Sequence, residues 1–408
     1  MRDLRTPEAP QAAADGPGFP DLDAALASGG PAEAVDRLVA DLEARGEYRM
    51  LLDALLLKAR VELGLPLIQV GRYADLPEED RVKFEGRYVE ALRHVGSKFL
   101  EAGDVATAWA YYQAIGEPEP VARALEELPP VDDPDKLARL IETAFHQGAN
   151  PRKGFEWILR SYGACSAITS LEQAGPVDPS ARVACVEMLV RHLHEQLVDN
   201  IRADVARRGQ PQRAKGAPLA AMVAGRDWLF DDDAYHTDVS HLTTVVRWSV
   251  MATDPEVLAL ALDLTEYGRR LSPRLQYDSA PPFEKTFEDH HVYLKALLGR
   301  DVDAAVEHFR GKLPARAEAG TEGGDPESTL PAQVLVNLLA RVGREGEAAE
   351  EAIRHLLDVP DAMLACPSIA ELCQRSGRLD RLAEAAVRMG HPVHYLAARI
   401  RPDAHGAS

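Results

Sequence analysis

Apolar residues recur three and four positions apart along almost the whole chain. Leu189, Leu193 and Leu197 form one such run, and Leu92 and Val95 belong to another. This spacing is typical of amphipathic helices that bury one face. Runs of this kind, separated by short turns, fit roughly twenty helices of about 10–20 residues. The pattern therefore predicts an all-α protein built from helical hairpins.

The best candidate for a β-strand is the β-branched stretch from Thr243 to Val250. Leu242, Val246 and Val250, however, share one face of a helix. We therefore expect a helix over 239–252 and no sheet.

Glycines mark many of the expected helix ends. Glycine adopts the left-handed conformation that closes a helix without the steric cost that other residues incur. Gly343 and Gly377 lie 34 residues apart, which is the period of tetratricopeptide repeats. The glycines expected in this role are Gly29, Gly46, Gly103, Gly299, Gly343 and Gly377.

One hairpin carries a fuller pattern of large, small and aromatic residues. In chain order it contains Leu92, Val95, Gly96, Phe99, the turn Ala102-Gly103-Asp104, Ala108, Tyr112, Ile115 and Pro120. This order resembles the tetratricopeptide-repeat (TPR) family, although leucine replaces a tryptophan at the first position and isoleucine replaces a small alanine near the end. The resemblance implies that the two helices approach closely at Gly96 and Ala108. It also implies that Phe99 and Tyr112 fill the space between this hairpin and the next.

The resemblance extends in a weaker form over residues 21–130 and 283–400, which is about half of the chain. It implies a TPR-like α-solenoid of stacked helical hairpins with an irregular helical middle region. Stacked hairpins curve, and their concave face offers a groove to a protein or peptide partner.

Proline- and glycine-rich stretches suggest where this organisation is interrupted. We expect a flexible leader over 1–20, N-terminal TPR-like hairpins over 21–130 and an irregular helical region over 131–314. A linker over 315–330, C-terminal TPR-like hairpins over 331–401 and a tail over 402–408 complete the expected division.

The charge balance limits the classes of partner. The chain has 46 basic and 65 acidic residues, a formal net charge of −19. This surplus argues against binding to nucleic acid or to anionic lipid, and it favours a basic partner. There is no apolar run long enough to span a membrane, no signal peptide and no pair of closely spaced cysteines. We therefore expect a cytoplasmic protein.

Common catalytic and nucleotide-binding motifs are absent from the sequence, so no organic cofactor is expected and no catalytic residue is assigned. Two carboxylate–histidine pairs at helical spacing are the exception. Asp238 and His241 form one pair and Glu288 and His291 the other, with His236 and His290 beside them. A carboxylate and an imidazole three positions apart can bind one metal ion. These six residues are therefore candidate ligands for Zn, Fe or Mn.

Structural roles are the explanation that we favour for the same residues. Asp238 is well placed to cap a helix, and His290 falls on an apolar stripe. Glu288 and His291 fit a solvated helix face. We favour a helical-repeat scaffold that binds a protein or peptide, with a metal-dependent enzyme or metal-binding protein as the alternative. A self-associating architectural protein is a third possibility that the sequence does not separate from the scaffold.

Overall fold

The computed structural model describes residues 19–68, 77–175, 177–214, 216–314 and 326–400. The predicted leader up to residue 18, the linker up to residue 325 and the tail lie outside these ranges. The described residues form helices and no strand, and their β pairing is a single bridge between Asp278 and Lys285. The prediction of an all-α protein is therefore confirmed.

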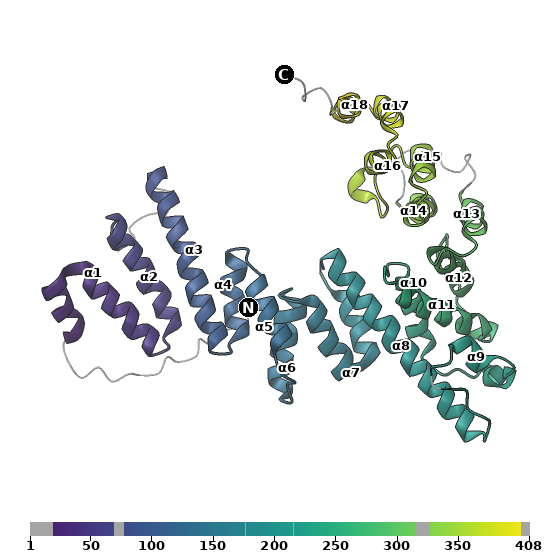
Figure 1. Cartoon of the computed structure of the whole chain (residues 1–408), viewed down its shortest axis with the longest axis horizontal. Helices are drawn as coiled ribbons and strands as arrows, with labels where there is room; N and C mark the ends of the chain where they lie inside the picture. Colours follow the sequence, from purple (N-terminus) through teal and green to yellow (C-terminus); the bar gives the residue numbers. More distant parts are fainter. Residues whose placement is uncertain (1–18, 69–76, 176, 215, 315–325, 401–408) are drawn as a thin grey trace, which may run out of the picture. The chain divides into compact units, whose positions relative to one another are not determined.

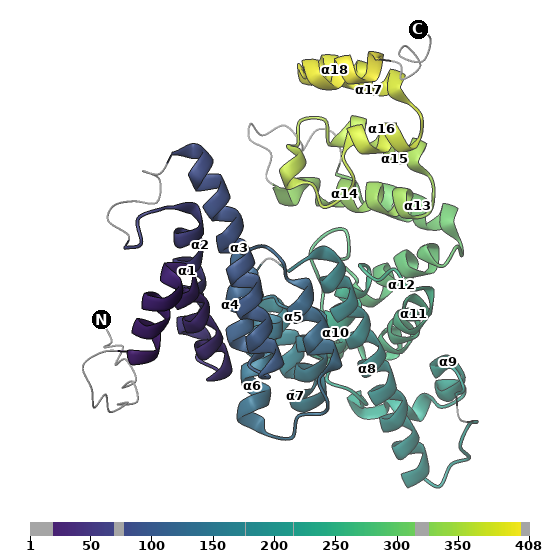
Figure 2. The ribbon, with the colours of Figure 1, turned by 60° about the vertical axis from the view of Figure 1, so that its left-hand side comes forward.

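The chain divides into two compact units, residues 1–157 and 158–408, with the division inside α7 (Pro151–Gln173). In the first unit, each helix from α2 to α5 packs against the one before it, α6 packs on α4, and α1 to α4 lie side by side in chain order (Figures 1 and 2). Its helices before α7 are α1 (Pro20–Ala44), α2 (Tyr48–Leu63), α3 (Glu78–Glu101), α4 (Val105–Ala114), α5 (Glu119–Glu127) and α6 (Pro134–Ile141), followed by a π-helical turn (Glu142–His146).

The second unit begins with a less regular group of helices. There α8 (Pro179–Arg207) packs against both α10 (Val239–Ser249) and α11 (Pro255–Arg270), and α11 also contacts the short α9 (Leu219–Val223). From α12 onward each helix packs mainly on its neighbours in the chain. These helices are α12 (Thr286–Leu297), α13 (Val302–Arg310), α14 (Pro326–Arg341), α15 (Glu345–His355), α16 (Ile369–Arg375), α17 (Leu379–Met389) and α18 (Pro392–Arg399).

Two predicted boundaries differ from the structure. The helix expected over 239–252 ends at Ser249. α14 begins at Pro326, so the last five residues assigned to the linker are helical. Proline suits the first turn of a helix because a backbone N–H in that turn would have no partner within the helix. Among the described residues, no helix is both long enough and apolar enough to cross a bilayer.

The glycine turns follow the prediction with one exception. Five of the six named glycines have φ between 70° and 78°, the left-handed conformation expected at a turn. The exception is Gly29, because its neighbour Gly30 is left-handed instead, with φ of 77°, and kinks α1 rather than ending it. Pro31 explains the choice, since the residue before a proline is disfavoured in the α conformation.

The hairpin of α3 and α4 has the close approach expected at Gly96. A Cβ atom added at Gly96 would lie 2.9 Å from Cε2 of Tyr112. Ala108 on α4 is completely buried. The ring of Phe99 packs edge-on against Tyr48 at the start of α2, with the ring centroids 5.3 Å apart. Small residues thus bring the two helices together, and an aromatic ring joins them to the preceding helix.

Candidate functional site

Asp238 caps α10. Its Oδ1 accepts hydrogen bonds from the backbone N–H groups of Ser240, at 2.8 Å, and His241, at 3.2 Å. The Ser240 hydroxyl donates to the same oxygen and, together with these N–H groups, lowers the pKa of Asp238. The first free amides of a helix are satisfied in this way. The carboxylate therefore fills the structural role that was the alternative to metal binding.

His236 precedes α10 and lies between α8 and α11. Its Nδ1 lies 3.1 Å from the hydroxyl of Tyr267 on α11, and the same hydroxyl accepts the backbone N–H of His236 at 2.8 Å. Its Nε2 lies 3.4 Å from a carboxylate oxygen of Asp204 on α8. Burial lowers the pKa of His236 and outweighs the opposing effect of Asp204. Both ring nitrogens thus have protein partners.

Glu288 and His291 join α12 to α11. The carboxylate of Glu288 binds Arg269, with Oε2 2.5 Å from Nε and Oε1 3.2 Å from Nη2. Nδ1 of His291 lies 3.1 Å from the hydroxyl of Thr265, and its Nε2 lies 3.5 Å from Glu266. Burial lowers the pKa of His291. The two residues connect the two helices through polar contacts and are not a free pair of ligands.

His290 belongs to the core. Its side chain is 2% exposed, its ring stacks on Phe283 at 4.1 Å, and Nδ1 lies 2.7 Å from the carbonyl oxygen of Thr286. Burial lowers its pKa to about 4, so the imidazole is neutral at pH 7. The remaining candidate, His241, is half-buried on α10.

The six candidate ligands do not gather into one cluster. Within the described ranges, no group of three or more His, Cys, Asp or Glu side chains is placed to hold a metal ion. The hydrogen bonds of His236, Glu288, His290 and His291 lead to other residues. The metal hypothesis has no geometric support here and stays a prediction for a binding measurement.

The most buried carboxylate of this region is one that the metal hypothesis did not include. Asp289 is 2% exposed and accepts hydrogen bonds from the backbone N–H of Lys285, from His308 Nε2 and from Lys312 Nζ, each at 2.8 Å. Lys312 also binds Glu284. Burial lowers the pKa of Lys312, but its hydrogen bonds with the two carboxylates outweigh this effect and raise it.

The sequence carries a signal for this buried carboxylate. Asp289 lies three residues after Thr286 and four before Tyr293, both of which are buried on the same face of α12. A charge on an apolar stripe is buried and must find partners. His308 and Lys312 are 19 and 23 residues away, so their identity as partners depends on how α12 and α13 pack.

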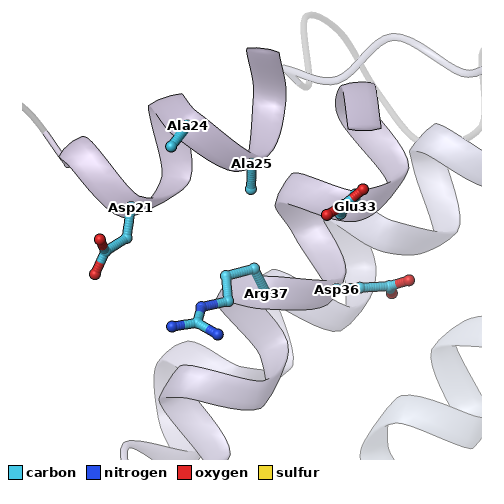
Figure 3. A pocket seen from close by; sticks show the side chains of 6 residues that line it. All are labelled: Asp21, Ala24, Ala25, Glu33, Asp36 and Arg37. Atoms are coloured by element: carbon cyan, nitrogen blue, oxygen red, sulfur yellow. The ribbon is translucent and has the colours of Figure 1, made fainter. Parts of the chain in front are cut away.

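One surface pocket lies at the kink of α1. Its lining side chains come from the two segments on either side of Gly30, as Figure 3 shows, and its volume is about 360 Å³. Carboxylates dominate it, and one of them, Asp36, is already paired with Lys58 on α2 at 2.7 Å. The lining residues are Asp21, Ala24, Ala25, Glu33, Asp36 and Arg37.

A second pocket is an apolar groove of about 490 Å³ between α17 and α18. Gly390 closes α17 in a left-handed conformation, and the chain returns antiparallel along α18, which buries none of its own residues. Val387 and Ile400 in the groove are 66% and 61% exposed. The groove is lined by Leu379, Asp380, Ala383, Glu384, Val387, Tyr395, Ala398, Arg399 and Ile400.

The groove between α17 and α18 is suited to binding rather than to catalysis. Six of its nine lining residues are aliphatic or aromatic, and its three charged residues, Asp380, Glu384 and Arg399, are exposed. Exposed apolar surface bordered by polar groups is typical of a site for protein–protein interaction. Val393 and Leu396 of α18 are also exposed, by 68% and 59%, but they do not line the groove.

Comparison with known proteins gives no relative for this chain. No family model matches it, and neither a curated protein nor a solved structure does. The two pockets and their side chains are therefore the basis for the function proposed next.

Proposed function

We propose that the chain is a TPR-like helical scaffold that binds a protein or peptide partner, and that the α17–α18 groove is a contact site for that partner. The left-handed glycine turns and the close approach at Gly96 support the repeat architecture. The exposed apolar lining of the groove is the observation that carries the binding function.

The free energy available at the groove favours a partner with apolar side chains. Val387 and Ile400 in the groove are 66% and 61% exposed. Covering the exposed part of such a side chain stabilises a complex by about 1–2 kcal/mol. These two side chains can offset part of the cost of association, which is of the order of 4–15 kcal/mol.

The carboxylates add a preference for positive charge. Asp380 lies on the α17 side of the groove, beside Glu384, which is paired with Arg381, and the whole chain carries a charge of −19. A lysine or arginine on the partner would be steered towards this surface and placed beside its apolar contacts. The proposed ligand is thus an apolar segment that carries at least one basic residue. The chain has four cysteines, too few and too scattered for a disulfide-stapled scaffold, which suits the reducing cytoplasm as the place of action.

Selection of displayed random peptides on the purified full chain tests this proposal. The selected peptides should combine apolar residues with lysine or arginine. The substitution Val387→Glu should raise their dissociation constants by about tenfold or more, because it puts a charge on the apolar surface. Val82→Glu is the matched control, since Val82 on α3 is 59% exposed and lies outside the groove. Equal binding to wild type and Val387→Glu would remove the groove from the proposal.

A further inference from the structure

The lining of the groove includes the same kinds of side chain that its partner needs. Resting on the proposed function, the partner must bring apolar side chains and a positive charge. The groove itself presents Ile400, the C-cap residue of α18, which is 61% exposed, and Arg399 beside it. The guanidinium of Arg399 lies over the Tyr395 ring at 5.6 Å, and neither Arg399 nor Asp380 forms an ion pair with another described residue. Both charges are thus free to pair with an incoming surface.

The antiparallel hairpin makes this surface complementary to itself. α17 begins at the end of the hairpin where α18 finishes (Figure 2). Asp380 in the first turn of α17 and Arg399 in the last turn of α18 therefore lie at the same end, on opposite walls. A two-fold axis that runs along the groove, in the plane of contact, places α17 of one copy against α18 of the other. Asp380 of each copy then faces Arg399 of the other, and the same operation repeats the pair. Isologous interfaces require this kind of self-complementary patch.

The charge distribution along the chain also favours this site for a second copy. Residues 331–400 carry eight arginines, no lysine and nine acidic residues, a formal charge of −1. The rest of the chain therefore carries −18 of the total of −19. Two copies repel each other through their net charge. This repulsion is weakest where the C-terminal helices meet.

We propose that the α17–α18 groove binds the same groove of a second copy of this chain, forming a two-fold dimer in which Asp380 of one copy pairs with Arg399 of the other. The apolar side chains of the groove, Val387 among them, then meet across the interface, with the exposed Glu384 between them and the two ion pairs at one end.

Sedimentation equilibrium of the full chain from about 1 to 100 µM measures this association. The wild type should approach the mass of two 44.5 kDa chains as concentration rises. Val387→Glu should raise the dissociation constant by about tenfold or more, whereas Val82→Glu should leave it unchanged. A wild type that stays at the mass of one chain, or a Val387→Glu variant that dimerises as the wild type does, would overturn the proposal.

Charge exchange tests the two-fold arrangement directly. In Asp380→Arg, arginines face each other across the interface, and in Arg399→Asp, aspartates do. Each variant alone should dimerise more weakly than the wild type. An equimolar mixture should restore association. In the heterodimer, position 380 of each copy faces an opposite charge at position 399 of the other copy, so both ion pairs form. If the mixture is no tighter than the two variants alone, the predicted pairing is wrong.

The two proposals can fail separately. A chain that remains monomeric at all concentrations, yet binds selected apolar–basic peptides in a Val387-dependent manner, overturns the dimer and supports the binding function. A wild type that neither dimerises nor selects such peptides overturns both. All the substituted residues are exposed, and circular dichroism spectra that match the wild type would show that a loss of association is not a loss of folding.

Discussion

Gly96 and Tyr112 meet so closely that a Cβ atom on residue 96 would stand 2.9 Å from the tyrosine ring. Tyr112 is 3% exposed, and it packs in a cluster that includes Val121 and Leu125 of α5. The ring therefore has little room to move away. The spacing of α3 and α4 depends on the absence of a side chain at this position.

We expect Gly96→Ala to lower the free energy of unfolding by about 1–3 kcal/mol, because overpacking outweighs the gain in helix propensity. Gly86→Ala is the matched control in the same helix. A Cβ atom there meets no atom within 4 Å, so the substitution should stabilise the protein by about 0.5–1 kcal/mol. Urea denaturation of the two variants measures both effects. Equal effects of the two substitutions would contradict the tight crossing.

Asp289 and Glu288 are neighbours in α12, but we expect Asp289 to contribute far more to the stability of the fold. Asp289→Asn removes a buried charge that His308 and Lys312 share, and leaves the ammonium group of Lys312 short of a partner. Breaking such a buried pair costs about 3–5 kcal/mol. The ion pair of Glu288 with Arg269 is half exposed, so Glu288→Gln should cost about 1 kcal/mol or less. Thermal unfolding of both variants checks the difference, and a smaller loss for Asp289→Asn than for Glu288→Gln would contradict it.

Helical spacing made most of the fold predictable, because each helix shows its buried face as a local period. The Gly29–Gly30 doublet shows a finer signal that the prediction did not use. The proline at position 31 selects Gly30 for the left-handed conformation. The turn glycines beyond it were predictable because a positive φ is a local property of the backbone.

The polar contacts and the groove were not predictable in the same way. The spacing of Asp238 and His241 fits a helix cap and a metal pair equally well, and the contacts of Asp238 identify the cap. The apolar stripe of α17, with Leu379, Ala383 and Val387, has the same period whether a neighbouring helix covers it or solvent does. Exposure depends on the tertiary arrangement, which the local pattern does not contain.

Stability should depend on pH through His290. Its pKa is about 4 in the folded protein and 6.5 in the unfolded reference, so the unfolded chain binds the proton more readily. The stabilisation is complete above pH 6.5 and is lost as the pH falls towards 4. Between pH 7 and pH 5, the free energy of unfolding of the wild type should fall by about 2 kcal/mol more than that of His290→Gln, because glutamine does not titrate.

Urea denaturation at the two pH values measures this difference. His146→Gln is the control for the same substitution at an exposed histidine. A His290→Gln variant that loses as much stability as the wild type would show that this imidazole does not titrate as its burial requires.

Metal analysis of the purified full chain, after incubation with Zn, Fe and Mn in turn and removal of the excess, tests the six candidate ligands. We expect less than about one equivalent of any metal, because structural sites need several converging ligands and the described part of the chain brings no three together. His241→Ala and His291→Ala are the decisive variants. Stoichiometric metal in the wild type that is lost in both would restore the metal hypothesis, because those two histidines lie on different helices and only a shared site would make both necessary.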